Sequence, residues 1–327
     1  MKKKKPVVLV TEKEYKKGQN IFQSITDLEL ILVSETEYSI AQLVREKNPI
    51  AVILGVEKYS SELYLALKKG CLIVRFGVGY DGIDLKKASE HGLIVTNTPG
   101  VIESTVAEFT FLLAGEIMRK IGFINQKMQK GQWIPILGNE FRKKNWAILG
   151  FGKIGKQLSR ILTFGFGIKV FAFDIICDNQ QRLEIDYGIE KISSELSQIV
   201  SHADIVSLHL PSNENTYHFL NKESLKLFKP GSILLNTARG ALIDEDALYD
   251  AIKDGYLSGA GLDVFENEPY SPVNSNKDLR EFPNVILTPH IASSTIECSS
   301  RMANRTIQNI RYAVQGKYEL MDIVNEI

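Results

Sequence analysis

Three ionisable side chains follow the ends of predicted strands closely enough to act together on a small substrate. They are Arg239, Glu268 and His290. Imidazole titrates near neutral pH and can give or take a proton, a neighbouring carboxylate favours its charged form, and a guanidinium can hold a substrate carboxylate. Because ligands bind at the carboxyl ends of the strands in open α/β sheets, these residues predict an acid–base site. By spacing alone, however, each could also be a solvated charge in a loop.

The chain has five histidines, and their positions differ. His290 comes directly after the last predicted strand, where Pro289 ends strand pairing and projects the next side chain from the ligand edge. By itself it could also be a buried structural imidazole. His209 lies near the carboxyl end of another strand and could line the same pocket. The remaining three, at positions 91, 202 and 218, fit a helix end, the start of a strand and a polar connection.

A glycine-rich turn predicts a phosphate-binding site. The segment Trp146-Ala-Ile-Leu-Gly150-Phe-Gly152-Lys-Ile-Gly155 reads as a strand that leads into a helix. Gly150 permits the tight turn, Gly152 lets the backbone approach a pyrophosphate, and Gly155 lets the helix pack closely on the sheet. The pyrophosphate would lie at the helix N-terminus, where N–H groups are unpaired. In a chain with 24 glycines, these three could also be ordinary turn residues.

Asp174 strengthens the dinucleotide interpretation and indicates which dinucleotide is bound. It ends a predicted strand nineteen residues after Gly155, where an acidic side chain can accept hydrogen bonds from the adenosine ribose. A carboxylate at this place repels a 2′-phosphate, and residues 175–178 contain no Arg or Lys to stabilise one. We therefore expect NAD(H) as cofactor rather than NADP(H), with no metal.

Short β-branched runs alternate with amphipathic segments, which predicts parallel sheets covered by helices on both faces. The two series of runs indicate two doubly wound α/β domains. The stretch 101–129 lies between the two series. As a helix it would have apolar residues on every side, which predicts a helix that is buried on most sides. Strands are expected at 6–10, 28–33, 50–54, 71–75 and 93–96, then at 145–149, 168–173, 204–210, 232–236, 258–263 and 285–288, and a last helix at 294–315.

Composition is that of an ordinary globular protein and excludes several classes. Of 327 residues 44% are hydrophobic, and 39 Lys+Arg balance 39 Asp+Glu, so no global field favours nucleic acid or a membrane surface. The basic run Lys2–Lys5 is followed at once by Pro6, unlike an export signal, and the apolar stretch 101–118 contains three glutamates, unlike a membrane span. Three cysteines without CxxC spacing fit a reducing cytoplasm.

Several motifs in one order resemble the D-isomer-specific 2-hydroxyacid dehydrogenase family over nearly the whole chain, most densely from 75 to 294. The resemblance is slightly greater to its phosphoglycerate dehydrogenase group, in a short form without a C-terminal regulatory domain. Ala147, where many members have Gly, and the polar connection 271–282 depart from the pattern. The motifs are Arg75-Phe-Gly-Val-Gly-Tyr-Asp-Gly-Ile-Asp84, Thr98-Pro-Gly100, Val106-Ala-Glu108, the glycine turn with Asp174, His209-Leu-Pro211, Asn236-Thr-Ala-Arg-Gly240, Gly261-Leu-Asp-Val-Phe-Glu-Asn-Glu-Pro269 and Thr288-Pro-His-Ile291.

The resemblance implies that the two domains are nested. A flavodoxin-like substrate-binding domain would contain residues 1–99 and 290–327, and an inserted Rossmann NAD-binding domain residues 100–289. The active site would lie in the cleft between them, and hinge closure would exclude water. Members usually pair through their cofactor domains, so we expect a homodimer whose interface includes the helix that begins near Val101.

The resemblance also implies a role for each site residue. His290 would be the general acid/base in reversible hydride transfer between NAD(H) and C2 of a small 2-hydroxy or 2-keto acid, with Glu268 favouring its protonated form. Arg239 would hold the substrate carboxylate, together with the N–H groups of Val78 and Gly79. The expected cofactor contacts are Thr105, Gly150, Gly152, Lys153, Ile154, Gly155, Asp174, His209, Pro211, Thr237, Ala238, Asp263 and Ala292.

The sequence leaves two questions open, the identity of the substrate and the choice between an enzyme and a regulator. The substrate could be 3-phosphoglycerate or could be hydroxypyruvate or glyoxylate. A phosphate would need a cation near the end of the strand at Leu54, where Glu57 has the wrong sign and only Lys58 or Arg142 could serve. The alternative to an enzyme is an NAD(H)-sensing, corepressor-like regulator of the same fold, although the intact Arg239, Glu268 and His290 set favours an enzyme.

Overall fold

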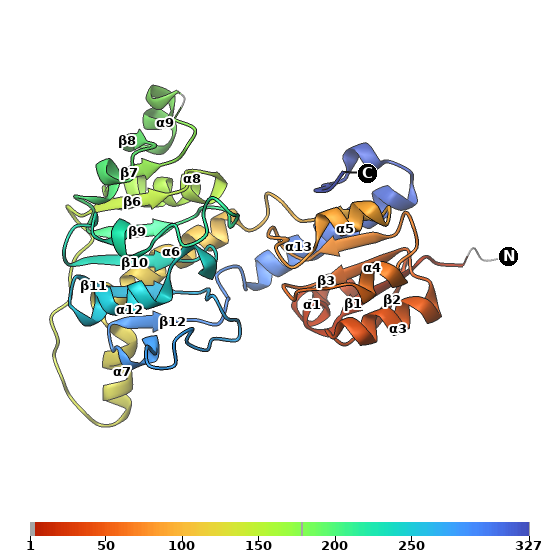
Figure 1. The fold of residues 1–327 in the computed structure, drawn as a ribbon, viewed down its shortest axis with the longest axis horizontal. Helices are drawn as coiled ribbons and strands as arrows, with labels where there is room; N and C mark the ends of the chain where they lie inside the picture. Colours follow the sequence, from red (N-terminus) through yellow and green to blue (C-terminus); the bar gives the residue numbers. More distant parts are fainter. Residues whose placement is uncertain (1–3, 178, 327) are drawn as a thin grey trace. The chain divides into compact units, whose positions relative to one another are not determined.

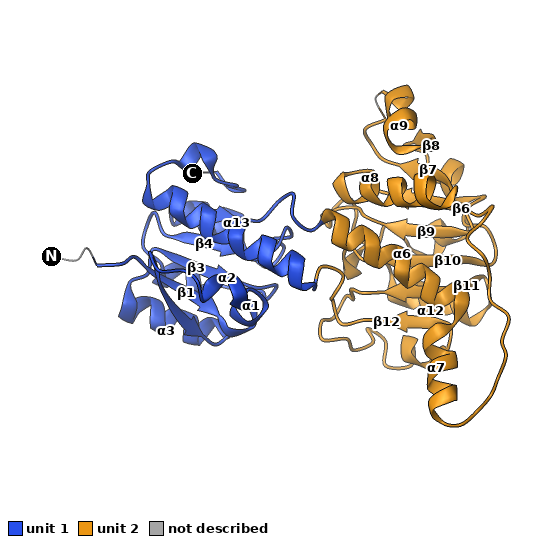
Figure 2. Cartoon of the chain, turned by 180° about the vertical axis from the view of Figure 1, so that it is seen from behind, with its two compact units in different colours: residues 1–102, 294–327 blue, residues 103–293 orange. Residues whose placement is uncertain are grey.

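The predicted strands form two separate parallel sheets, one in each of two compact units. The structure is a computed structural model that describes residues 4–177 and 179–326. Unit 1 contains residues 1–102 and 294–327, and unit 2 contains residues 103–293 (Figure 2). The predicted boundaries, after residues 99 and 289, lie close to these positions. Residues 1–3 and 327, at the ends of the predicted substrate domain, and Asp178 in the stretch after Asp174 lie outside the described residues.

Unit 1 has a five-stranded sheet in the order β2-β1-β3-β4-β5, and all its pairs are parallel (Figure 1). This is the flavodoxin-like order, in which the strand order reverses between β1 and β3. Its strands are β1 (Val7–Thr11), β2 (Glu29–Val33), β3 (Ala51–Leu54), β4 (Leu72–Arg75) and β5 (Ile94–Thr96). Its helices are α1 (Glu12–Lys17), α2 (Gln19–Phe22), α3 (Glu37–Lys47), α4 (Glu62–Ala66), α5 (Leu85–Glu90) and α13 (Ile296–Val314).

Two hydrophobic clusters cover the two faces of the unit 1 sheet. On one face, Val8, Val10 and Ile53 pack with residues of α13 such as Ile307 and Ile310. On the other, the buried residues of β1 and β3 pack with helices α3 and α4. Because α13 follows unit 2 in the chain, the sequence leaves unit 1 and returns to complete it.

Unit 2 has a seven-stranded, wholly parallel sheet in the order β12-β11-β10-β9-β6-β7-β8 (Figure 1). Numbered from its own first strand, this is the Rossmann order 3-2-1-4-5-6 with one more strand at the end, so the predicted fold class is confirmed for both sheets. The strands are β6 (Asn145–Leu149), β7 (Lys169–Phe173), β8 (Ile189–Ser193), β9 (Ile205–Leu208), β10 (Ser232–Asn236), β11 (Leu257–Leu262) and β12 (Val285–Leu287).

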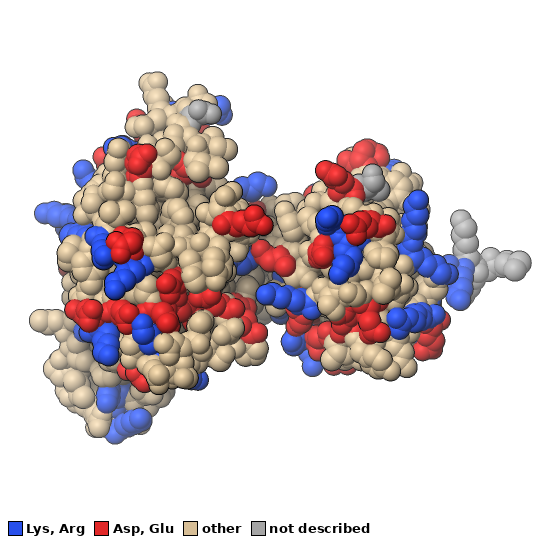
Figure 3. Space-filling view, in the orientation of Figure 1, with Lys and Arg blue, Asp and Glu red and all other residues tan. Residues whose placement is uncertain are grey.

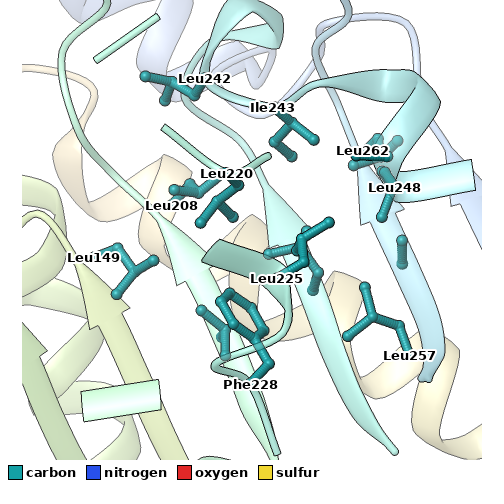
Figure 4. Packing of buried hydrophobic residues seen from close by; sticks show 14 of the residues in the cluster. Leu149, Leu208, Leu220, Leu225, Phe228, Leu242, Ile243, Leu248, Leu257 and Leu262 are labelled. Atoms are coloured by element: carbon teal, nitrogen blue, oxygen red, sulfur yellow. The ribbon is translucent and has the colours of Figure 1, made fainter. Parts of the chain in front are cut away.

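The core of unit 2 consists of leucine, isoleucine and phenylalanine side chains from the strands and their covering helices. Figure 4 shows Leu149, Leu208 and Phe228 among the residues that pack on one face. Its helices are α6 (Glu103–Arg119), α7 (Ile121–Gln129), α8 (Lys153–Arg160), continued by a π-helical turn (Ile161–Gly165), α9 (Gln180–Tyr187), α10 (Ser197–Val200), α11 (Lys222–Leu225) and α12 (Glu245–Lys253).

The predicted helix at 101–129 differs from the structure. It is two helices, because Lys120 takes a left-handed conformation, with φ of 56°, between α6 and α7. Helix α6 buries Leu113 and Ile117 but leaves Leu112 65% exposed, and α7 has no buried residue. The prediction of burial on most sides was therefore wrong for the second half. Apolar residues in this segment cover only one face of the sheet and continue onto the surface.

Acidic and basic side chains are intermixed on the face of each unit that Figure 3 shows. This fits the balance of charges in the sequence. No helix in the described part of the chain is long and apolar enough to span a membrane. The three cysteines, Cys71, Cys177 and Cys298, form no disulfide.

Candidate active site

His290 and Glu268 form an ion pair beyond the carboxyl edge of the unit 2 sheet. Nδ1 of His290 lies 2.8 Å from Oε2 of Glu268, and both side chains are one-third exposed. The Phe265 N–H donates to the other carboxylate oxygen at 3.1 Å. Burial alone would raise the pKa of Glu268, but the hydrogen bond and charge of His290, with a further contribution from Arg239, lower it below its usual value. Nε2 of His290 therefore remains as the nitrogen that can exchange a proton with a substrate.

Asp263 fixes the backbone that carries His290. The main-chain oxygen of Asp263 accepts from His290 N–H at 2.8 Å. Its buried carboxylate accepts from the Thr288 hydroxyl at 2.6 Å and from the N–H groups of Ile291 and Ala292, each at 2.8 Å. Burial raises the pKa of this carboxyl group, and the three hydrogen bonds oppose that rise. The family resemblance implied only a cofactor contact for Asp263; the local sequence pattern did not reveal its support of His290.

Arg239 lies on a turn that packs against the loop before Glu268. The Asn236 side chain holds this turn, donating to Arg239 O at 2.8 Å and accepting from Ala238 N–H at 3.0 Å. At Gly240 a Cβ atom would lie 1.9 Å from the carbonyl carbon of Phe265, so only glycine fits there. The turn that carries Arg239 and the loop that carries Glu268 are thus in direct backbone contact.

Two further residues brace this contact, and the sequence analysis missed both. Glu245 at the start of α12 is buried, its pKa is raised by burial, and its Oε1 accepts from Glu266 N–H at 2.9 Å. Nε2 of His218 lies 3.0 Å from Oε1 of Glu266, although not in hydrogen-bond geometry. For His218 the sequence indicates only a polar connection. The one local signal for Glu245 is that it is an acidic residue in the first turn of a predicted helix. An acidic residue at that position usually serves only to stabilise the helix N-terminus.

The glycine turn has the shape that a pyrophosphate needs. Gly150 has φ of 99°, and its Cβ would meet the backbone of His209 at 2.6 Å. A Cβ on Gly155 would lie 2.4 Å from Gly150 O, so helix and turn pack as closely as predicted. In contrast, a Cβ on Gly152 would meet nothing within 4 Å. Open space at the N-terminus of α8, beside Lys153 and Ile154, fits the phosphates of a dinucleotide.

Asp174 lies at the end of β7 with its carboxylate against the glycine turn. It accepts from the Phe151 N–H at 2.8 Å and from the Ile176 N–H at 3.0 Å. Each carboxylate oxygen can accept more than one hydrogen bond, so capacity remains for ribose hydroxyls. The geometry fits an adenosine ribose bound beside the pyrophosphate.

The other residues predicted to contact the cofactor also belong to unit 2. Thr237 and Ala238 follow β10, His209 and Pro211 follow β9, and Ala292 follows β12, so all of them lie beyond the carboxyl ends of parallel strands. Thr105 lies in the first turn of α6, and Thr110 of the same helix lies 2.8 Å from Thr237, oxygen to oxygen. Burial lowers the pKa of His209 to about 3, so this imidazole stays neutral.

Val78 and Gly79 lie in unit 1, on the turn that follows β4. Val78 O accepts from the Asn97 side chain at 2.8 Å, and Gly77 O accepts from Thr98 N–H at 3.0 Å. Arg239, Glu268, His290 and the residues predicted to contact the cofactor thus belong to unit 2, and the predicted carboxylate-binding turn belongs to unit 1.

Comparisons with known proteins agree with this geometry. Residues 111–292 match the model of the NAD binding domain of the D-isomer specific 2-hydroxyacid dehydrogenases. A glyoxylate reductase of Korarchaeum cryptofilum is 34% identical over 313 residues, 94% of this chain and 92% of the relative. A hydroxypyruvate reductase of Thermotoga maritima is 35% identical over 263 residues, 80% and 83% of the two chains.

Solved structures give the same fold. The D-lactate dehydrogenase of Aquifex aeolicus, complexed with NAD and lactic acid, has a TM-score of 0.82 and 28% identity over 98% of this chain and 99% of that one. An NADPH-dependent glyoxylate/hydroxypyruvate reductase of Sinorhizobium meliloti, in complex with NADP and malonate, has a TM-score of 0.80 and 27% identity over 94% and 93%.

Proposed function

Because the chain belongs to the D-isomer specific 2-hydroxyacid dehydrogenase family, we propose that it reduces glyoxylate, hydroxypyruvate or a similarly small 2-keto acid with NADH, reversibly. As a member of this family it is an NAD(P)-dependent oxidoreductase that acts on the CH–OH group of 2-hydroxy acids. The observation that carries the proposal is the His290–Glu268 pair near the charge of Arg239. The regulatory alternative is not favoured, since the related proteins are named as enzymes.

In this reaction each side chain has one task. When NADH is bound, its nicotinamide would supply the hydride. His290 donates a proton from Nε2 to the carbonyl oxygen of the substrate and takes it back in the oxidative direction. Glu268 stabilises the imidazolium through Nδ1, and Arg239 holds the substrate carboxylate and polarises the adjacent carbonyl. Unit 2 would hold NAD, and the N–H groups of Val78 and Gly79 would bind the substrate carboxylate.

Charges at the end of β3 support an unphosphorylated substrate. A Cβ on Gly55 would lie 2.6 Å from a carboxylate oxygen of Glu14 and 2.6 Å from one of Glu57, so both acids approach the end of this strand. Lys13 is paired with Glu57 at 2.9 Å. A phosphate at this place would face two carboxylates, which favours glyoxylate or hydroxypyruvate over 3-phosphohydroxypyruvate.

The proposal is tested by following the loss of nicotinamide absorbance with glyoxylate, hydroxypyruvate, pyruvate and 3-phosphohydroxypyruvate. We expect the highest kcat/KM with one of the first two, and a higher value with NADH than with NADPH because of Asp174. If no keto acid is turned over, and an NADH-dependent protein partner is captured instead, the regulatory alternative replaces this proposal.

Replacing Glu268 with glutamine should change the pH dependence of reduction. Reduction needs the charged imidazolium of His290, and glutamine removes the carboxylate that stabilises this charge. The alkaline limb of the kcat/KM profile should therefore move to lower pH. A pH profile of Glu268→Gln that overlays the wild-type profile would contradict the role of the pair.

The surface of unit 2 supports a homodimer. Leu112 on α6 and the segment after α7 expose large apolar side chains, among them Trp133, 82% exposed, and Leu137, 93% exposed. Apolar side chains that are exposed together can mark a protein–protein contact, and a second copy of the chain is the partner we propose. Sedimentation should give twice the mass of one chain, and Leu137→Glu should shift the equilibrium toward the monomer.

We further propose a cytoplasmic location, in keeping with the absence of disulfides.

A further inference from the structure

The turn after β4 has two consecutive carbonyl groups held from the same side. The buried Asn97 side chain donates to Val78 O at 2.8 Å, and the N–H of buried Thr98 donates to Gly77 O at 3.0 Å. In a trans peptide the C=O and the following N–H point in opposite directions. The N–H groups of Val78 and Gly79 therefore both point away from Asn97 and Thr98.

These two N–H groups are available to a ligand. Neither has a hydrogen-bond acceptor within residues 4–177 and 179–326. The preceding Gly77 has φ of 142°, a conformation that favours glycine and allows successive N–H groups to face one direction. Adjacent N–H groups that converge in this way form an anion-binding concavity. Its direction depends on the hydrogen bond from Asn97.

Asn97 is itself held by residues more than two hundred positions away. Its N–H donates to Asp322 O at 3.3 Å, and its main-chain oxygen accepts from Asn309 Nδ2 at 3.1 Å. The Asp322 N–H donates to Asn309 Oδ1 at 3.0 Å, and the Asp322 carboxylate is paired with Arg305 at 2.6 Å. Helix α13 and the segment after it thus fix Asn97 from both sides.

We propose that Asn97 is a positioning residue that aims the Val78 and Gly79 N–H groups at the carboxylate of the substrate. This inference rests on the proposed function, in which these two N–H groups bind a 2-keto acid. Without the amide donor, the Val78–Gly79 peptide can turn over and present its carbonyl oxygen to the substrate carboxylate, which repels it. The loss falls on substrate binding and leaves the cofactor site in unit 2 intact.

The test compares Asn97→Asp with a matched control, Asn325→Asp. Both variants replace an amide that donates to a backbone carbonyl in unit 1, since Asn325 Nδ2 donates to Leu93 O at 3.0 Å. Only Asn97→Asp faces the turn at Val78. Its KM for glyoxylate should rise about tenfold or more, as expected for a lost hydrogen bond with a part-buried acceptor left unpaired. Its kcat should fall less, and its Kd for NADH should match the wild type.

A second readout is the binding of oxalate, an unreactive carboxylate, to the enzyme–NADH complex by calorimetry. Asn97→Asp should weaken oxalate binding, and Asn325→Asp should not. Asn97→Ser, which removes the donor without adding charge, should act in the same direction and serves if the aspartate variant does not fold.

Three results distinguish the inference from the function on which it rests. Unchanged KM and oxalate affinity in both Asn97 variants, or an equal loss in Asn325→Asp, overturns the role of Asn97. Absence of turnover in the wild type overturns the proposed function alone if oxalate still binds and Asn97→Asp abolishes that binding. Absence of both turnover and oxalate binding in the wild type overturns both.

Discussion

Replacing His290 with alanine should lower kcat for keto-acid reduction by about 10²–10⁴-fold, the usual loss when a general acid is removed. In the His290–Glu268–Arg239 set, the imidazole is the group proposed to donate the proton. Without it, the proton for the developing alkoxide must come from water. Steady-state kinetics at several pH values measure the loss, and the pH dependence that the imidazole causes should disappear with it.

His91→Ala is the control for this variant. His91 ends helix α5 in unit 1, and its replacement should leave kcat unchanged. The Kd for NADH should remain the same in both variants, because the cofactor residues do not depend on either imidazole. A His290→Ala enzyme with wild-type kcat would show that another group supplies the proton.

Replacing Arg239 with alanine should lower kcat/KM by about 10²–10⁴-fold. A guanidinium can make two parallel hydrogen bonds to a carboxylate, and hydrogen bonds to charged groups contribute about 1.5–3 kcal/mol each. The loss should appear mainly in KM, with a smaller part in kcat because the carbonyl is also less polarised. Kinetics over a wide range of glyoxylate concentration separate the two.

Arg239→Lys tests whether the shape of the guanidinium matters. Lysine keeps the charge but lacks the planar fork, so this variant should lie between alanine and the wild type. The Asn236 bonds to the turn involve only the backbone at Arg239, so they should survive either substitution. If both variants bound glyoxylate as the wild type does, Arg239 would not be the residue that holds the carboxylate.

The sequence was sufficient to predict the central strands and the residues that follow them. Strands β6 and β10 lie at their predicted residues because both are buried on both faces and read as continuous apolar runs. The glycine turn was equally clear, because Gly150 and Gly155 each have a separate steric cause. The positions of the candidate site residues could be predicted, because a residue that follows a parallel strand lies at the edge of the sheet.

Other features depend on partners that no local pattern reveals. Strand β8 was missed because it lies at the sheet edge and exposes Glu190, which breaks the apolar run. The break between α6 and α7 lies at Lys120, which takes a left-handed conformation. Gly and Asn are the residues that usually take this conformation, so the sequence contains no signal of the break. The sequence around Asn97 indicates only a turn. Its positioning role could not be predicted, because its hydrogen-bond partners Asn309 and Asp322 are distant in the chain.

The return of the chain to unit 1 has a consequence for its synthesis on the ribosome. Unit 2 is one continuous segment, so it can fold as soon as residue 293 has emerged. The core of unit 1 lacks Met302, Ile307, Ile310 and Met321 until the residues after unit 2 are made. The part of unit 1 that is synthesised before unit 2 therefore waits for the part synthesised after it, and unit 1 is the second of the two units to be completed.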